Sequence, residues 1–226
     1  MSRDANPPSG PAAHPLLQHI APAMLERLRI YEALLRKWQR TINLVGPTTL
    51  DAIWIRHFAD SIQVSDAVPE ARRWLDLGSG AGFPGLVTAI RYADDPQAAV
   101  HLIESDQRKC AFLRGVSRET GAPAIIHCGR IEAILPEFDA PVEAISARAL
   151  APLPVLLDYA GKLIENGATG VFSKGEQAEA ELTDSGLTSR FSITTLASRT
   201  SPSARIFIVK RRPDFGQPRA ASTGPA

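Results

Sequence analysis

The sequence contains few cysteines and no long apolar run, and each shortage excludes a class of protein. Its two cysteines among 226 residues, Cys110 and Cys128, provide neither a disulfide framework nor the spacing of a zinc site. No stretch approaches the roughly 20 apolar residues of a membrane-spanning helix. The N-terminal stretch MSRDANPPSGPAAHP lacks the apolar core of a signal peptide. We therefore expect a cytoplasmic globular protein with no metal site and no membrane partner.

An excess of charge of one sign is also lacking, because 25 Lys and Arg against 24 Asp and Glu leave a net charge of only +1. A chain with this balance does not attract nucleic acid over its whole surface, so an anionic partner must be bound by a local patch. The sequence also has no long exposed apolar stripe that would demand a protein partner, which leaves the oligomeric state open and favours a monomer.

Composition divides the chain into four parts. Residues 1–14 and 213–226 are rich in proline, glycine and small residues, and we predict that both are disordered. Residues 15–70 show helical periodicity and are predicted to form a helical segment that packs on the rest. Residues 71–212 alternate between short apolar runs and helix-patterned stretches, as in a Rossmann-like domain.

Two helices are predicted in the N-terminal segment. Over residues 22–39, apolar side chains recur every three or four positions and charged side chains fill the other face. A second helix is predicted over residues 53–64, with Thr48 or Thr49 as its cap.

The remainder predicts an α/β fold. The predicted strands are 72–78, 99–105, 124–129, 142–148, 167–174, 191–196 and 204–210. The predicted helices between them are 84–92, 106–119, 152–163 and 176–184. Crossover helices imply a mostly parallel seven-stranded sheet with helices on both faces. The last two strands are joined by only ASRTSPS, which is too short for a helix, so they should form an antiparallel C-terminal hairpin.

The first strand runs into a glycine-rich turn, WLDLGSGAGFPG, the usual ligand crevice of such a sheet. Two kinds of nucleotide site fit this turn. A dinucleotide site would use Gly-x-Gly-x-x-Gly, here Gly80, Gly82 and Gly85, with Glu104 at the end of the second strand. An S-adenosylmethionine site would use Asp-x-Gly-x-Gly-x-Gly, here Asp76, Gly78, Gly80 and Gly82.

The charge of the turn favours S-adenosylmethionine. A pyrophosphate binds exposed amides at a helix N-terminus, but Asp76 would place a negative charge beside it and Pro84 removes one amide. The sulfonium and ammonium groups of S-adenosylmethionine are instead attracted to a carboxylate. Glu104 serves either cofactor, because its oxygens can accept both ribose hydroxyls.

Several stretches together resemble one family of bacterial enzymes. They are NLVG (43–46), RHFADS (56–61), WLDLGSGAGFPGL (74–86), LIESDQRKCAFLR (102–114) and ISARAL (145–150). The family is the small-subunit ribosomal RNA guanine-N(7) methyltransferase, also called glucose-inhibited division protein B. The resemblance covers about residues 25 to 210, although Ser79 and Ala81 occupy positions where the family often has threonine and proline.

The resemblance implies a class I methyltransferase fold, S-adenosylmethionine as cofactor, and 16S ribosomal RNA or a small-subunit particle as partner, with a guanine of the 530 loop as target. Carried over position by position, the cofactor site comprises Asp76, Gly78, Gly80, Phe83, Glu104, Ile131, Glu132 and Arg148. Glu104 would bind the ribose, while Ile131 and Glu132 would lie against the adenine. An alternative is that Glu132 serves only the first turn of a helix. Arg148 is also the expected catalytic residue, which would orient the cofactor or the guanine.

The fourth strand lacks the motifs of other base methyltransferases. ISARAL offers no Asn/Asp-Pro-Pro-aromatic group for an exocyclic amine, and neither cysteine is placed to attack a pyrimidine ring. Ring nitrogen 7 of guanine already has a free lone pair, so its methylation needs no general base and rests on proximity. This absence agrees with the family resemblance.

Contacts with RNA are expected at four basic residues near the catalytic edge: Arg56, His57, Lys174 and Arg205. His57 could instead be a structural histidine that packs the helices onto the sheet. Two other classes of function stay open: a class I methyltransferase acting on another RNA, a protein or a small molecule, and a nucleotide-binding oxidoreductase or binding module.

Overall fold

The computed structural model describes residues 15–175 and 190–213. The disorder predicted for 1–14 and for nearly all of 213–226, and the helix predicted over 176–184, lie outside these residues.

A seven-stranded sheet forms the centre of the molecule, and its strand order is β3-β2-β1-β4-β5-β7-β6. The strands are β1 (Arg73–Leu77), β2 (Ala99–Glu104), β3 (Ala124–Cys128), β4 (Ala144–Arg148), β5 (Thr169–Lys174), β6 (Phe191–Ala197) and β7 (Arg205–Arg211). The first five strands are parallel, while β7 runs antiparallel to both β5 and β6. The predicted mostly parallel sheet with a C-terminal antiparallel hairpin is confirmed, with the later strand of the hairpin on the inside.

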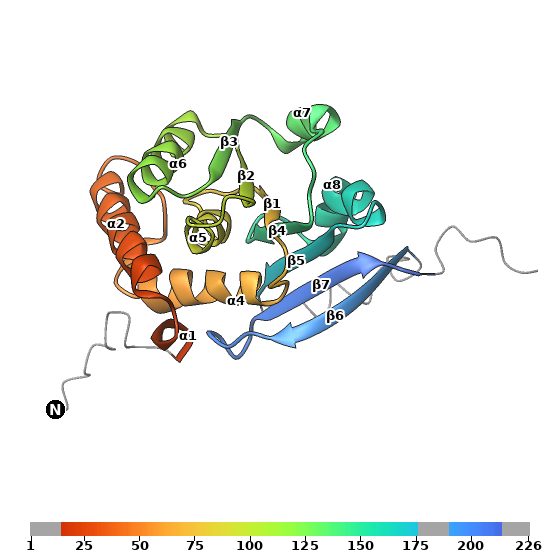
Figure 1. Ribbon diagram of the computed structural model, residues 1–226, viewed down its shortest axis with the longest axis horizontal. Helices are drawn as coiled ribbons and strands as arrows, with labels where there is room; N and C mark the ends of the chain where they lie inside the picture. The colour runs from red at the N-terminus through yellow and green to blue at the C-terminus, as the bar shows by residue number, and fades with distance from the viewer. Residues whose placement is uncertain (1–14, 176–189, 214–226) are drawn as a thin grey trace, which may run out of the picture.

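Helices cover both faces of the sheet, as predicted (Figure 1). On one face lie α2 (Pro22–Trp38), α4 (Asp60–Asp66), α5 (Gly85–Arg91) and α6 (Gln107–Thr120). On the other lie α7 (Ile131–Ile134), the short 3-10 helix η3 (Leu135–Glu137) and α8 (Leu153–Glu165). Successive strand residues point to opposite faces, so Trp74 enters the first core and Leu75 the second. Both cores are apolar because the sheet is buried on both sides.

The N-terminal segment differs from the prediction between residues 47 and 66. It begins with the short helix α1 (Pro15–Gln18), and the predicted helix 53–64 is a π-helical turn, η2 (Trp54–Ala59), followed by α4. A separate short helix, α3 (Pro47–Leu50), has Gly46 at its N-cap and no side-chain cap. The predicted cap of the helix over 53–64 is wrong, because Thr48 and Thr49 lie inside α3 and the N-cap of η2 is Ile53, with no side-chain hydrogen bond.

An aromatic cluster joins α2 to the glycine turn that follows β1. Tyr31 is fully buried, and its hydroxyl donates a hydrogen bond to the carbonyl of Ala81. Its ring stacks on Phe83, with centroids 5.3 Å apart, and also contacts Phe58 and Phe112. Helix α2, which begins some 60 residues earlier in the chain, therefore packs against the turn through Tyr31.

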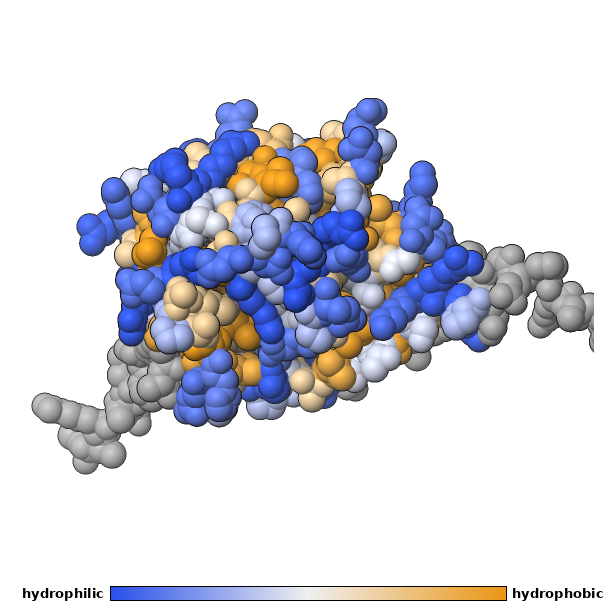
Figure 2. All heavy atoms as spheres, viewed as in Figure 1, coloured by the Kyte–Doolittle hydropathy of each residue, from blue (hydrophilic) through white to orange (hydrophobic). Residues whose placement is uncertain are grey.

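The surface is mostly polar. Figure 2 shows hydrophilic side chains surrounding separate apolar patches on the visible face. Among the described residues, the large apolar side chains with substantial exposure are Ile125, Val155 and Leu196, which lie on different elements. In the same part of the chain, no helix combines the length and the apolarity needed to cross a bilayer.

Candidate active site

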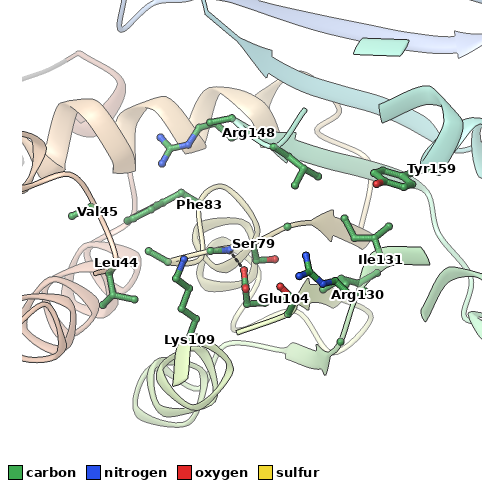
Figure 3. A pocket seen from close by; sticks show the side chains of 18 of the residues that line it. Leu44, Val45, Ser79, Phe83, Glu104, Lys109, Arg130, Ile131, Arg148 and Tyr159 are labelled. Carbon is green, nitrogen blue, oxygen red and sulfur yellow. Dashed lines mark hydrogen bonds between the residues drawn. The ribbon is translucent and has the colours of Figure 1, made fainter. Parts of the chain in front are cut away.

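A cavity of about 470 Å³ opens at the carboxyl ends of the parallel strands (Figure 3). It lies beside β1 and β4, where the strand order reverses, and this switch point is where doubly wound sheets bind ligands. The glycine turn, the ends of β2, β3 and β4, and parts of the N-terminal segment line it. Of the predicted cofactor residues, those that line the cavity are Gly78, Gly80, Phe83, Glu104, Ile131, Glu132 and Arg148.

The glycine turn depends on backbone geometry that other residues rarely adopt. Gly78 has a φ of +64°, and a Cβ there would lie 2.5 Å from a methyl carbon of Leu150. Gly80 has a φ of +58°, but a Cβ there would meet only the carbonyl oxygen of Gly78, at 3.9 Å. Gly78 is therefore required by packing, whereas Gly80 keeps open a space that forms part of the cavity.

Glu104 connects the end of β2 to the glycine turn. Its two carboxylate oxygens accept hydrogen bonds from the backbone amides of Gly80 (2.8 Å) and Asp106 (2.8 Å). The side chain is 8% exposed and lines the cavity. Each carboxylate oxygen can accept a second hydrogen bond, so capacity remains for hydroxyl groups of a ligand.

Asp76 lies beneath the turn rather than in the cavity. It is fully buried, its Oδ1 accepts a hydrogen bond from Ser146 (2.6 Å), and its Oδ2 has no partner among the described residues. A Cβ on Gly85 would lie 2.5 Å from Asp76, so this glycine lets α5 pack directly on the carboxylate. Burial raises the pKa of Asp76 to about 6, against the hydrogen bond from Ser146. The geometry does not support the predicted direct contact of Asp76 with a cofactor.

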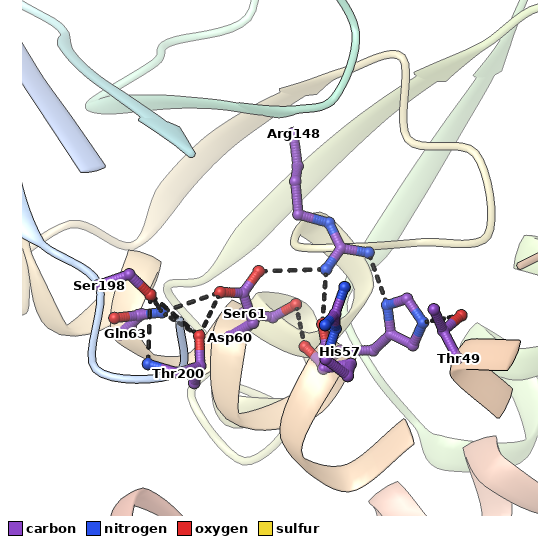
Figure 4. A network of polar contacts seen from close by, with 9 residues as sticks. Thr49, His57, Asp60, Ser61, Gln63, Arg148, Ser198 and Thr200 are labelled. Carbon is purple, nitrogen blue, oxygen red and sulfur yellow. Dashed lines mark hydrogen bonds and ion pairs between the residues drawn. The ribbon is translucent and has the colours of Figure 1, made fainter. Parts of the chain in front are cut away.

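Arg148 ends β4 and is held on several sides (Figure 4). Its Nη1 donates to the backbone carbonyl of Arg56 (3.1 Å) and to Oδ2 of Asp60 (3.1 Å), and its Nη2 donates to Nδ1 of His57 (2.9 Å). The guanidinium also lies 5.1 Å from the ring centre of Phe83. These contacts fix a permanently charged group at the mouth of the cavity.

His57 is neutral in this arrangement. Since an arginine can only donate, Nδ1 of His57 must accept, and its Nε2–H donates to the hydroxyl of Thr49 (3.0 Å). Burial, followed by the positive charges of Arg148 and Arg56, lowers the pKa of His57 to about 3. His57 lines the cavity, but both of its nitrogens are engaged and its ring stacks on Phe83 at 4.7 Å, which leaves no N–H for a phosphate in this arrangement. The geometry favours the structural alternative.

Sequence reasoning missed the second half of the network around Arg148. Asp60 also accepts hydrogen bonds from the hydroxyl of Thr200 (2.7 Å) and from Nε2 of Gln63 (2.9 Å), and Gln63 bonds Ser198 (3.1 Å). The turn between β6 and β7 is thereby connected to the active site. No local pattern reveals this link, because Asp60 and Thr200 are 140 positions apart.

At the opposite end of the cavity, Ile131 and Glu132 lie after β3 as expected, and Tyr159 of α8 joins them. The hydroxyl of Tyr159 donates to Glu132 and lowers the pKa of that carboxyl. Sequence reasoning did not identify Tyr159. It also overlooked other lining residues, which include Leu44, Val45, Lys109 and Arg130, although Leu44 and Val45 belong to the NLVG stretch that supports the family resemblance.

The remaining basic residues lie near the same edge of the sheet but outside the cavity. Lys174 pairs with Arg205 across β5 and β7, and its Nζ donates to the carbonyl of Ala151 (2.7 Å). Arg205 donates to carbonyls of its own turn, while Arg56 is exposed. Contact of these three residues with RNA stays a prediction. Among the described residues, no cluster of three His, Cys, Asp or Glu side chains could hold a metal ion.

Residues 24–201 match the model of a family described as GidB, rRNA small subunit methyltransferase G. The chain belongs to this family. It is 51% identical over 180 residues to a protein of Methylobacterium nodulans, covering 79% of this chain and 84% of the relative. It is 52% identical over 168 residues to a protein of Parvibaculum lavamentivorans, covering 74% of each. Both relatives are named ribosomal RNA small subunit methyltransferase G.

Solved structures of methyltransferases share the fold. The O-methyltransferase TomG of Streptomyces achromogenes, in complex with S-adenosylmethionine, has a TM-score of 0.58 and 18% identity, and the match covers 83% of this chain and 90% of that one. An O-methyltransferase of Bacillus cereus in complex with SAH has a TM-score of 0.53 and 16% identity, covering 84% and 91%. The predicted class I methyltransferase fold is confirmed, and with it the family's methyl donor, S-adenosylmethionine.

Proposed function

We propose that this chain methylates ring nitrogen 7 of a guanine in 16S ribosomal RNA, using S-adenosylmethionine, in the cytoplasm. Family membership supports the ribosomal RNA substrate, because both relatives named above are ribosomal RNA methyltransferases of the small subunit. The guanine of the 530 loop, the choice between RNA and an assembling particle, and a monomeric state are part of the same proposal.

The cavity fits the cofactor on two counts. The open space at Gly80 allows a ligand to approach the backbone of the turn. Glu104 lies where its carboxylate could accept ribose hydroxyls while it still holds the amide of Gly80. Ile131 would cover one face of the adenine, and Glu132, fixed by Tyr159, would lie beside it. When bound, S-adenosylmethionine supplies an electrophilic methyl group on its sulfonium.

The observation that carries the choice of nitrogen 7 is the state of the titratable groups near Arg148. His57 is neutral with both nitrogens engaged, so it is not placed as the general base that an exocyclic amine or a hydroxyl acceptor would use. The remaining lone pairs of Glu104 are assigned here to the ribose hydroxyls, which leaves that carboxylate on the cofactor rather than on the acceptor. Ring nitrogen 7 has no proton to lose. Its lone pair forms the new N–C bond, the C–S bond breaks with its electrons going to sulfur, and no proton moves.

The test is methyl transfer by the purified full chain to 16S RNA and to small-subunit particles from cells that lack the gene. The acceptor's nucleosides are then separated by mass spectrometry. We expect 7-methylguanosine at one position, in at least one of the two acceptors. Transfer to a bulk protein extract instead, or a methyl group on another atom of the RNA, would contradict the proposal. Sedimentation of the same purified chain tests whether it is a monomer in solution.

A further inference from the structure

The cavity has a second half that includes residues outside the predicted cofactor set. Leu44 and Val45, here called the N-terminal wall, line it from the loop after α2. In Figure 3 they lie on the left, near Phe83, whereas Ile131 and Tyr159 lie on the right. The adenine end and the N-terminal wall are therefore at opposite ends of the cavity.

One side chain fixes the N-terminal wall. Gln39, at the C-terminus of α2, accepts hydrogen bonds at Oε1 from the backbone amides of Leu44 (3.0 Å) and Val45 (3.0 Å). Its Nε2 donates to the carbonyl of Val45 (2.9 Å). Gln39 thus satisfies three backbone groups of a loop that has no regular structure there. The wall is 9% exposed at Leu44 and 7% at Val45, so only a small apolar surface faces the cavity.

Arg148 retains hydrogen-bonding capacity near the same half. A guanidinium has five N–H groups, and three of them donate to Arg56, Asp60 and His57. The Nε–H and one Nη2–H have no acceptor among the described residues. An apolar wall, an aromatic ring and a planar donor pair together suit a flat aromatic group that carries hydrogen-bond acceptors. Guanine has this chemistry, because it presents O6 and N7 side by side.

We propose that this half of the cavity is the subsite for the methyl-accepting guanine base, with the N-terminal wall against the base and Gln39 as a positioning residue. The inference rests on the proposed function and adds where the base binds. The base must leave its stack to reach a methyl group inside the cavity, and a preformed wall receives it without further ordering of the loop. The sheet domain then binds the cofactor, and the N-terminal segment binds the acceptor.

Two variants of the full chain test the subsite. Val45→Trp fills the space for the base, and Gln39→Ala releases the wall. For both, we expect the Kd for adenosylhomocysteine, measured by calorimetry, to stay within about twofold of wild type. Methylation of 16S RNA should fall by about 10- to 100-fold, the usual cost of a misplaced reacting group. For Gln39→Ala the fall should appear in kcat more than in KM.

Two further variants separate positioning from stability. Gln39→Glu keeps the oxygen that accepts both amides but cannot donate to Val45, so it should recover part of the lost rate. Ser117→Ala is the matched control, since the Ser117 hydroxyl donates to the backbone of the turn after α6 (2.9 Å) and does not line the cavity. Its methylation rate should equal that of wild type even if its melting temperature falls as much as that of Gln39→Ala.

Two results would overturn the subsite while the proposed function stands. One is a loss of adenosylhomocysteine affinity in Val45→Trp that matches its loss of methylation, which would assign the wall to the cofactor. The other is wild-type methylation of RNA by both Val45→Trp and Gln39→Ala. A wild-type chain that methylates neither RNA nor particles would instead overturn the proposed function, and the guanine subsite with it.

Discussion

The two sides of the cavity differ in how the chain builds them. On the sheet side, the turn from Gly78 to Gly82 and the carboxylate of Glu104 lie at the ends of adjacent strands, and each belongs to a short local motif. On the helical side, His57 and the Leu44–Val45 wall, which Gln39 holds, reach the cavity from separate parts of the N-terminal segment. Arg148 connects the two sides. The sheet side therefore depends on backbone geometry, whereas the helical side depends on side-chain contacts between distant segments.

The largest effect is expected on the sheet side. Gly80→Val should abolish adenosylhomocysteine binding, because its side chain would project into the open part of the cavity and β-branched residues rarely adopt a positive φ. Calorimetry measures the loss. Gly121→Val is the matched control, since Gly121 has a similar positive φ of +64° but lies outside the cavity, and a Cβ there would meet nothing within 4 Å. Normal binding of adenosylhomocysteine by Gly80→Val would show that the cofactor does not lie against the turn at Gly80.

At the junction of the two sides, Arg148→Lys should reduce the methylation rate on the order of 10- to 100-fold. A lysine cannot donate simultaneously to Asp60, the Arg56 carbonyl and His57 in the planar arrangement that arginine provides. Arg148→Ala should be at least as damaging. Rates are measured with 16S RNA, and thermal unfolding serves as the control for folding. A wild-type rate in Arg148→Lys would show that planar positioning is not needed.

On the sheet side again, Glu104→Gln should weaken adenosylhomocysteine binding by about 1–3 kcal/mol, the usual range for a charge-assisted hydrogen bond. The amide keeps one acceptor but loses the charge that favours bonds from ribose hydroxyls. Isothermal titration of this variant beside Asp106→Asn identifies the carboxylate involved. A loss in Asp106→Asn alone would assign the ribose to the neighbouring acid.

The smallest effect concerns the buried support of the turn. Because folding raises the pKa of Asp76 from 3.8 to about 6, the native state binds this proton more tightly than the unfolded state does. The contribution of Asp76 to stability therefore falls as the pH rises from about 4 to 6 and is constant above that. Asp76→Asn removes this dependence. The free energy of unfolding of the variant minus that of wild type should therefore increase by about 1 kcal/mol from pH 5 to pH 8. Urea unfolding at both pH values measures the change, and an unchanged difference would contradict a raised pKa.

The same contrast explains what the sequence could predict. The strands, the helices α5, α6 and α8 and the position of Glu104 follow from periodicity and turn residues, which are local signals. Sequence alone also suggested that Asp76 faces the ligand, but packing of α5 at Gly85 places the carboxylate beneath the turn. The link from Asp60 to Thr200 and the stacking of Tyr31 on Phe83 arise only in the folded chain. The π-helical turn that presents His57 also differs from the regular helix that local periodicity predicts over 53–64.

Hydrogen exchange of the full chain, with adenosylhomocysteine alone and then with 16S RNA added, tests the division of the cavity most directly. We predict that adenosylhomocysteine slows exchange in peptides covering residues 78–82 and 104–106 and leaves those covering 42–46 unchanged. RNA should then slow exchange over 42–46. Equal protection of 42–46 and 78–82 by adenosylhomocysteine alone would contradict the account, because the helical side would then belong to the cofactor.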